Sequence, residues 1–313
     1  IMSKYDLTIV ENRTNIFSLL RDCEQICLSE SEQQFAAFDL LYQVWEKVSG
    51  KLWNLGYWYD YFQCGNVTLN CAKMTKNIVI QAQLLGEMGW LRMEWEDFVH
   101  ANSYFQECLQ IYQVLDDARN QCRMFRYLGV LAHRQGELNL ALNYYSKAWQ
   151  IVKDNQDKLL IDDKWAFQEA ELPNIIGCVY LELAEFAASY NQLKLSLQNY
   201  QKLLENFPQL KGKYRYYLAD PLLNMGRWYC SQANYKKAED YYQECRQLSQ
   251  EINRPDTMAE VLLRMAELAE VEGNLDEALR LAEEAVKVAG TEVKLVRDRA
   301  ASFTERLLNN QAS

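Results

Sequence analysis

The chain has 313 residues, and 49% of them are hydrophobic while 24% are charged, which describes a folded protein rather than a disordered one. Its formal net charge of −10 argues against nucleic acid or an anionic membrane as the main partner. Only four prolines and twelve glycines interrupt it, so long helices are expected. No run of apolar residues reaches the length of a membrane span.

Several classes of chemistry are disfavoured by the motifs that the sequence lacks. It has nine cysteines but no CxxC, and only two histidines, so we interpret the thiols as small apolar core residues in a reducing compartment. It contains no GxxxxGK[ST], no GxGxxG, no HExxH and no nucleophile elbow. We therefore expect no enzyme, no cofactor and no metal, with an unrecognised active site as the minor alternative.

Amphipathic patterns predict helices over residues 4–28, 32–48, 52–63 and 67–76, with Gly50 as the stop of the second. The third carries a cluster of six aromatic side chains, Trp53, Tyr57, Trp58, Tyr59, Tyr61 and Phe62. This cluster is interpreted as a core seam between early helices, with a ligand-facing patch as the alternative.

Two copies of one pattern follow at an offset of 40 residues. Leu85, Met88, Gly89, Ala101, Phe105 and Cys108 recur as Phe125, Leu128, Gly129, Ala141, Tyr145 and Ala148. Small residues twelve apart allow two helices to approach closely, and the aromatic residue is expected to fill the seam between a hairpin and its neighbour. Gly136 stands where the turn between the helices is expected.

This pattern resembles the tetratricopeptide repeat, a helix-turn-helix unit of about 34 residues, in a variant with longer helices. The resemblance implies an all-α, right-handed superhelix (an α-solenoid). It also implies that the chain binds proteins or peptides rather than performing chemistry.

Later copies are less regular. The third is aligned on Ala184, Ser196 and Tyr200, with a first helix over about 164–190 that Pro173 should kink or break. The fourth and fifth are aligned on Gly226 and Ala266. The predicted division is 1–77 as degenerate helical hairpins, five repeats within 78–290 (78–116, 118–153, 164–209, 216–252 and 256–290), and 291–313 as a capping helix.

A second resemblance concerns residues 5–150. Glu11 and Asn15 with Leu19 and Leu20, followed by Trp53-x-x-x-Tyr57-Trp58, are similar to the start of the repeat array in bacterial signal-transduction ATPases with numerous domains. In that family the array is a C-terminal sensor behind a nucleotide-binding module. Because Ile precedes Met at the start, the sequence indicates either an engineered start or a piece of a longer protein.

In tetratricopeptide arrays the first helix of each repeat lines a concave groove. Carried onto this sequence, the resemblance implies a groove with Trp90, Arg92, Arg123, Arg126, His133, Arg134 and Arg227, and further positions at Glu94, Val130, Leu181, Glu185, Leu223, Ser231, Leu263, Glu267 and Glu270. The arginines could receive carboxylates through bidentate contacts, or could simply pair with neighbouring acids. The Lys and Asn set with which chaperone-binding members clamp a C-terminal carboxylate is absent from matching positions.

The function expected from the sequence is therefore a cytoplasmic, bacterial protein-interaction scaffold for a protein or peptide, possibly an acidic one. Its most specific form is the sensor array of a signalling ATPase. The alternative is a stand-alone adaptor.

Overall fold

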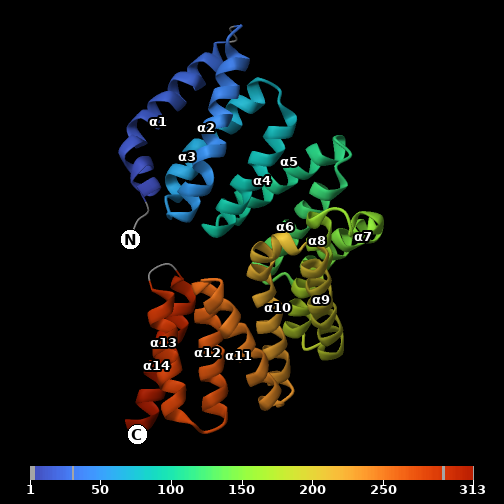
Figure 1. Cartoon of the computed structure of the whole chain (residues 1–313), viewed down its shortest axis with the longest axis vertical. Coiled ribbons are helices and arrows are strands. Elements are labelled where there is room, and N and C mark those ends of the chain that lie inside the picture. The colour runs from blue at the N-terminus through green and yellow to red at the C-terminus, as the bar shows by residue number, and fades with distance from the viewer. Residues whose placement is uncertain (1–3, 30–31, 291–292, 313) are drawn as a thin grey trace. The chain divides into compact units, whose positions relative to one another are not determined.

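A computed structural model describes residues 4–29, 32–290 and 293–312, and the side chains of residues 4–11 and 310–312 are outside this description. Every regular element in these ranges is a helix (Figure 1). The chain forms two compact units, residues 1–148 and 149–313, whose boundary lies inside α7. The all-α helical-repeat fold predicted from the sequence is confirmed.

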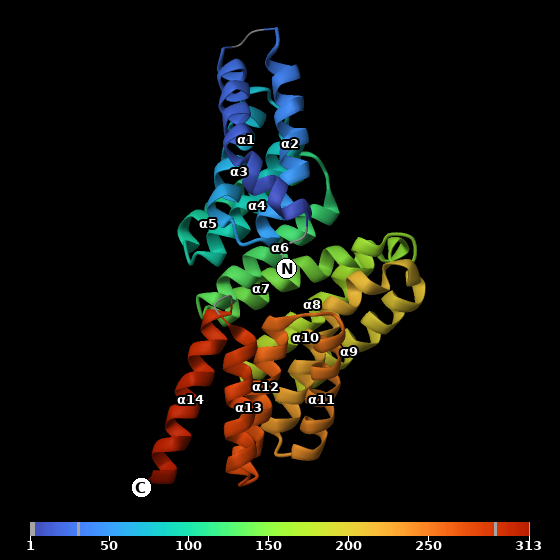
Figure 2. The same cartoon turned by 60° about the vertical axis from the view of Figure 1, so that its left-hand side comes forward.

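The first unit contains α1 Lys4–Leu28, α2 Gln34–Asn54, α3 Trp58–Met74, α4 Ile78–Glu94, α5 Phe98–Val114, α6 Ala118–Arg134 and most of α7 Leu138–Lys153. Helix α1 packs on α2 and α3 (Figure 2). From α3 to α6 each helix has 17 residues and the next begins 20 residues later, which explains the 40-residue offset.

The second unit contains α8 Asp163–Glu182, α9 Phe186–Asn206, α10 Lys211–Ser231, α11 Tyr235–Glu251, α12 Pro255–Val271, α13 Leu275–Ala289 and α14 Lys294–Ala312, with short 3-10 turns η1 Gln156–Lys158 and η2 Pro208–Leu210. Helices α8 with α9, α10 with α11, and α12 with α13 pair as hairpins, and α14 packs on α13 and α12. No helix in the described part of the chain is long and apolar enough to cross a membrane.

One type of turn connects most neighbouring helices. After α6 the Gly136 N–H donates to the His133 carbonyl at 2.9 Å, and the Glu137 N–H donates to the Ala132 carbonyl at 2.9 Å. These two bonds define a Schellman motif, which requires a left-handed residue in its centre. Gly136 has φ +77°, so the predicted turn is confirmed. The central residues of the equivalent turns, mostly not glycine, are Gly56, Lys76, Glu96, Asp116, Ala184, Ala233, Asn253 and Gly273.

The predicted stop at Gly50 is wrong, because α2 continues to Asn54 and α3 is one helix where two were predicted. A Cβ at Gly50 would meet no atom within 4 Å, so this glycine is only an exposed helix residue. The turn falls at Gly56, which takes φ +73°.

Of the aromatic cluster, Tyr61 is buried, with its ring 4.8 Å from that of Trp45 and 5.4 Å from that of Trp53. Trp53, Tyr57 and Phe62 pack against the core, whereas Trp58 and Tyr59 are exposed.

The small and aromatic residues of the repeat meet inside each hairpin. A Cβ added to Gly129 would lie 2.2 Å from Cε1 of Tyr145, a fully buried ring. The same arrangement joins Gly89 to Phe105 and Gly226 to Tyr242. The aromatic side chain therefore fills the space over the glycine of its own hairpin, whereas the sequence pattern predicted it in the seam between a hairpin and its neighbour.

The third repeat was aligned seven residues too late. Gly177 lies under Leu193, sixteen residues later, and Ser189 donates to the Gly177 carbonyl at 2.8 Å. Gly177, rather than Ala184, therefore corresponds to Gly129, while Ala184 is the left-handed turn residue at φ +59°. The error has two causes: nine residues, 154–162, separate α7 from α8 where three separate neighbouring helices from α2 to α7, and α8 has 20 residues rather than 17.

The predicted break at Pro173 does not occur, because α8 continues from Asp163 to Glu182. A proline inside a helix leaves the carbonyl four residues earlier without its usual donor. Here that carbonyl belongs to Glu169, and Asn199 Nδ2 on α9 donates to it at 3.0 Å. Tertiary packing thus supplies the hydrogen bond that the proline removes.

Candidate functional site

The first helices of the hairpins carry the predicted groove residues. Six of them lie in the first unit: Trp90 and Arg92 on α4, and Arg123, Arg126, His133 and Arg134 on α6. Arg227 lies on α10 in the second unit. Helices α4 and α6 are in contact, so the first unit presents a surface formed by both.

Two of these arginines have carboxylate partners of their own. Arg92 Nη1 lies 3.0 Å from Asp97 Oδ2, and its guanidinium centre is 4.4 Å from the Phe62 ring centroid. Arg134 Nη2 on α6 lies 2.9 Å from Glu94 Oε1 on α4. These contacts match the alternative in which the arginines pair with neighbouring acids, and they join elements of the unit.

Arg123 is different. It is half-buried, and its one hydrogen-bond partner among the described residues is the Tyr112 hydroxyl, 3.4 Å from Nη2. Its Nε is buried without a hydrogen-bond partner in the same set of residues. No described carboxylate lies within 4 Å of this guanidinium, although arginine is charged at every physiological pH.

The electrostatic surroundings keep Arg123 charged. Burial opposes the charge, but the neighbouring Tyr127, Tyr112 and Cys108 and the more distant Glu87 outweigh it, so the pKa of Arg123 stays above its ordinary value. Glu87 accepts a hydrogen bond from the Tyr61 hydroxyl at 2.6 Å. Glu87 is thus engaged by Tyr61 of α3.

Aromatic rings surround the cations on this surface. The rings of Trp90 and Tyr127 lie 4.8 Å apart, which joins α4 to α6. The Arg126 guanidinium centre is 5.0 Å from the Tyr127 ring, within the range of a cation–π contact. Guanidinium groups held against rings have few conformations to lose on binding, which favours recognition of a planar carboxylate. We call the surface formed by Trp90, Arg123, Arg126 and Tyr127 the arginine–aromatic surface.

The positions predicted on α12 do not form an open groove. Leu263 is buried. Arg306 of α14 lies 2.7 Å from Glu270, and Arg299 of α14 lies 3.9 Å from Glu267. Helix α14 therefore pairs with the acids of α12.

The corrected register of the third hairpin also changes its groove positions: Glu185 precedes α9 and is no longer one of them, whereas Leu181 stands four residues after Gly177, as His133 stands after Gly129. Asn174 stands three residues before Gly177, as Arg126 stands three residues before Gly129. Cys178 follows Gly177 as Val130 follows Gly129. With Gly177 as the counterpart of Gly129, the positions three residues before and one residue after this glycine would have identified Asn174 and Cys178 from the sequence.

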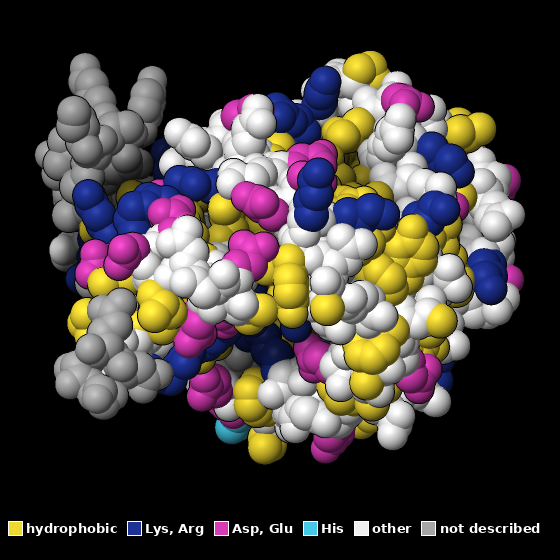
Figure 3. All heavy atoms as spheres, turned by 90° about the horizontal axis from the view of Figure 1, so that it is seen from below, with side chains coloured by type: hydrophobic (Ala, Val, Ile, Leu, Met, Phe, Trp, Pro, Cys, Tyr) yellow, Lys and Arg dark blue, Asp and Glu magenta, His cyan; other side chains and the backbone are white. Residues whose placement is uncertain are grey.

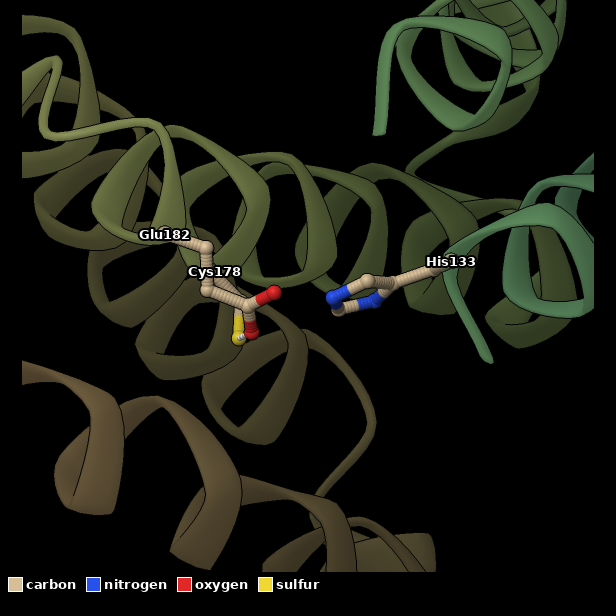
Figure 4. Close-up of side chains that lie close together, drawn as sticks. All are labelled: His133, Cys178 and Glu182. Carbon is tan, nitrogen blue, oxygen red and sulfur yellow. Dashed lines mark hydrogen bonds between the residues drawn. The ribbon is translucent and has the colours of Figure 1, made fainter. Parts of the chain in front are cut away.

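The described surface of the protein carries charges of both signs. Lysine, arginine, aspartate and glutamate side chains are intermixed on the face drawn in Figure 3. His133 lies half-buried in the last turn of α6 (Figure 4).

Comparison with known proteins agrees with this geometry. The tetratricopeptide repeat family matches residues 176–251. A search among curated protein sequences found no match. The fold is similar to that of a Rap protein complexed with competence and sporulation factor, at 14% identity and a TM-score of 0.61, covering 90% of this chain and 78% of that one.

Two further structures share the fold. The apo form of RapI is 13% identical with a TM-score of 0.56, and the similarity covers 86% of this chain and 97% of that one. Yeast Tom70 is 15% identical with a TM-score of 0.56, and the similarity covers 95% of this chain and 59% of that one. Residues 176–251 thus match the tetratricopeptide repeat, and the chain shares the helical-repeat fold of these solved structures.

Proposed function

We propose that this protein is an interaction scaffold that binds an acidic peptide, or an acidic segment of a protein, through the arginine–aromatic surface of its first unit. The observation that carries this proposal is Arg123, a half-buried cation whose hydrogen-bond partner among the described residues is a hydroxyl rather than a carboxylate. A carboxylate ligand would supply the counter-ion that the described residues do not. Trp90, Arg92, Arg126, His133 and Arg134 would extend the contact, with Arg227 acting in the second unit.

The wider role is part of the same proposal. We propose a bacterial, cytoplasmic scaffold that acts by binding rather than catalysis, and whose partner is neither nucleic acid nor membrane. We also retain as proposals the division into 1–77, 78–290 and 291–313, and a place in the sensor array of a signalling ATPase. The Rap protein complexed with competence and sporulation factor is a precedent for ligand binding on this fold.

Peptide selection tests the binding proposal. Random linear peptides displayed on phage are selected on the full chain, and the selected peptides are measured against Arg123→Gln and against Arg280→Gln as a control. Arg280 is an exposed arginine on α13 that pairs with Glu277. We expect the peptides to be rich in Asp and Glu, and we expect Arg123→Gln to weaken them about tenfold while the control leaves Kd unchanged. Peptides without acidic bias, or with unchanged affinity for Arg123→Gln, would contradict the proposal.

The larger context has a separate test. An antibody against this chain, used on a blot of the source cells, measures the size of the native protein. A band well above 36.8 kDa supports the sensor-array proposal, and a band near 36.8 kDa supports a stand-alone adaptor.

A further inference from the structure

A hollow lined by apolar side chains opens between α2 and the start of α4, within the first unit. Its volume is about 350 Å³. Phe35 is 57% exposed, Ile78 41% and Val79 57%, and the buried Phe38 completes the apolar lining. Single exposed apolar side chains are ordinary, but several of them around one hollow indicate an interaction surface. We call this feature, lined by Phe35, Phe38, Ile78 and Val79, the α2–α4 hollow.

Hydrogen bonds hold both walls of the α2–α4 hollow in place. The Tyr42 hydroxyl of α2 donates to Gln83 Oε1 of α4 at 3.1 Å, which joins the two helices. The Asn77 side chain caps the start of α4 by accepting from the Ile80 N–H at 3.2 Å. Because the walls are already ordered, filling the hollow costs little conformational freedom.

The two charged residues among those lining the hollow have opposite signs and come from opposite walls. Asp39 belongs to α2, and Lys76 belongs to the turn between α3 and α4. Both side chains are exposed, and neither has an ion-pair or hydrogen-bond partner among the residues that the structure describes. The charges of the hollow therefore cancel, on a chain whose formal net charge is −10.

A surface with one acid and one base on facing walls is complementary to itself. In a two-fold symmetric contact, a residue of one copy faces a second residue of the other copy, and the reverse pair forms at the same time. Asp39 of each copy would then face Lys76 of the other, and the exposed Phe35 ring of each would fill the hollow of the other. On an acidic chain, this neutral apolar surface is also a place where two copies repel each other little.

We propose that the α2–α4 hollow is the contact surface of a symmetric dimer of this chain. Burial of Phe35, Ile78 and Val79 supplies the attraction, and the two Asp39–Lys76 pairs fix the orientation of the copies. A contact centred on one hollow belongs among the smaller specific interfaces, so the dimer should be reversible and weak. This inference is independent of the proposed function, because the arginine–aromatic surface uses none of these residues.

Sedimentation velocity of the full chain, over concentrations from about 1 to 200 µM, measures the association. We expect the mass to rise from 36.8 kDa towards twice that value as the concentration increases. A chain that stays monomeric over the whole range would overturn the inference.

Single charge reversals identify the surface that is used. Asp39→Lys and Lys76→Asp each place like charges opposite one another in the symmetric dimer, so each variant alone should dimerise at least about tenfold more weakly. Lys47→Asp makes the same change as Lys76→Asp at an exposed position of α2 outside the hollow, and should alter the dimerisation constant less than about twofold. Equal weakening by all three variants, or by none, would overturn the inference.

Mixing the two weakened variants separates a lost contact from a lost fold. In a dimer of Asp39→Lys with Lys76→Asp, each reversed charge faces an opposite charge, so both ion pairs form again. We expect an equimolar mixture to dimerise nearly as strongly as the parent, which misfolded variants would not do. A mixture that remains monomeric would overturn the inference, while the peptide-binding test of the proposed function is unaffected by either result.

Discussion

Gly129→Ala and Gly86→Ala should change stability in opposite directions, although both glycines lie inside first helices of neighbouring hairpins. A Cβ at Gly129 would lie 2.2 Å from Cε1 and 2.4 Å from Cδ1 of Tyr145, more than 1 Å inside an ordinary contact. The Tyr145 ring is fully buried and has little room to move. A Cβ at Gly86 would meet Met124 Cε at 3.5 Å, which is an ordinary contact with a flexible side chain.

The magnitudes follow from two opposing effects. Overpacking costs about 1–3 kcal/mol, and replacing a helix glycine by alanine gains roughly 0.5–1 kcal/mol. We expect Gly129→Ala to lower the free energy of unfolding by about 1–2 kcal/mol, and Gly86→Ala to raise it by about 0.5–1 kcal/mol. Urea unfolding followed by circular dichroism measures both variants. A Gly129→Ala protein as stable as Gly86→Ala would refute the close contact between Gly129 and Tyr145.

Three more predictions concern the second unit. Ala184→Gly should raise the free energy of unfolding by about 1 kcal/mol, because Ala184 has φ +59°, and a Tm that falls would contradict this. Asn199→Leu should lower the free energy of unfolding by about 1–3 kcal/mol, because the Glu169 carbonyl, which has no helical donor at Pro173, would lose its hydrogen bond. The loss should be smaller in a Pro173→Ala background, as a double-mutant cycle measures. Burial alone would raise the pKa of Asp163, but hydrogen bonds from Tyr214 and from a neighbouring lysine lower this pKa below its ordinary value. The ionised carboxylate therefore stabilises the fold above about pH 4, and this stabilisation is lost as pH falls through the lowered pKa. Asp163→Asn should therefore be less stable than the parent at neutral pH, and equal loss at all pH values would contradict this.

The register error in the third hairpin shows where sequence reasoning was insufficient. Spacing alone made Ala184 the counterpart of Gly129, because both are small and are followed by a small residue and an aromatic at the expected distances. The structure selects Gly177, because it lies under Leu193. A longer connection before α8 and about one extra turn in α8 keep the amphipathic pattern of the helix unchanged, so periodicity could not reveal the shift.

Several features followed from local chemistry alone. The all-α class, the hairpins built on Gly89 and Gly129, and the turn at Gly136 were predicted correctly, because close helix contact and left-handed turns admit few residue types. The predicted stop at Gly50 was wrong, because a glycine is not confined to turns: a solvent-exposed glycine can remain inside a helix at a modest cost in stability.

The hydrogen-bond partners of the polar residues were decided by tertiary structure. Sequence spacing predicted Arg92, Arg123 and Arg134 as equivalent groove cations, but Asp97 and Glu94 pair with two of them, and Arg123 contacts a hydroxyl. Whether a charged side chain is paired depends on which helices pack side by side. The sequence of one helix does not say which side chains of another helix will lie against it. The sequence therefore determined the repeat, while the packing of one hairpin on the next decided which of its polar groups remain available to a ligand.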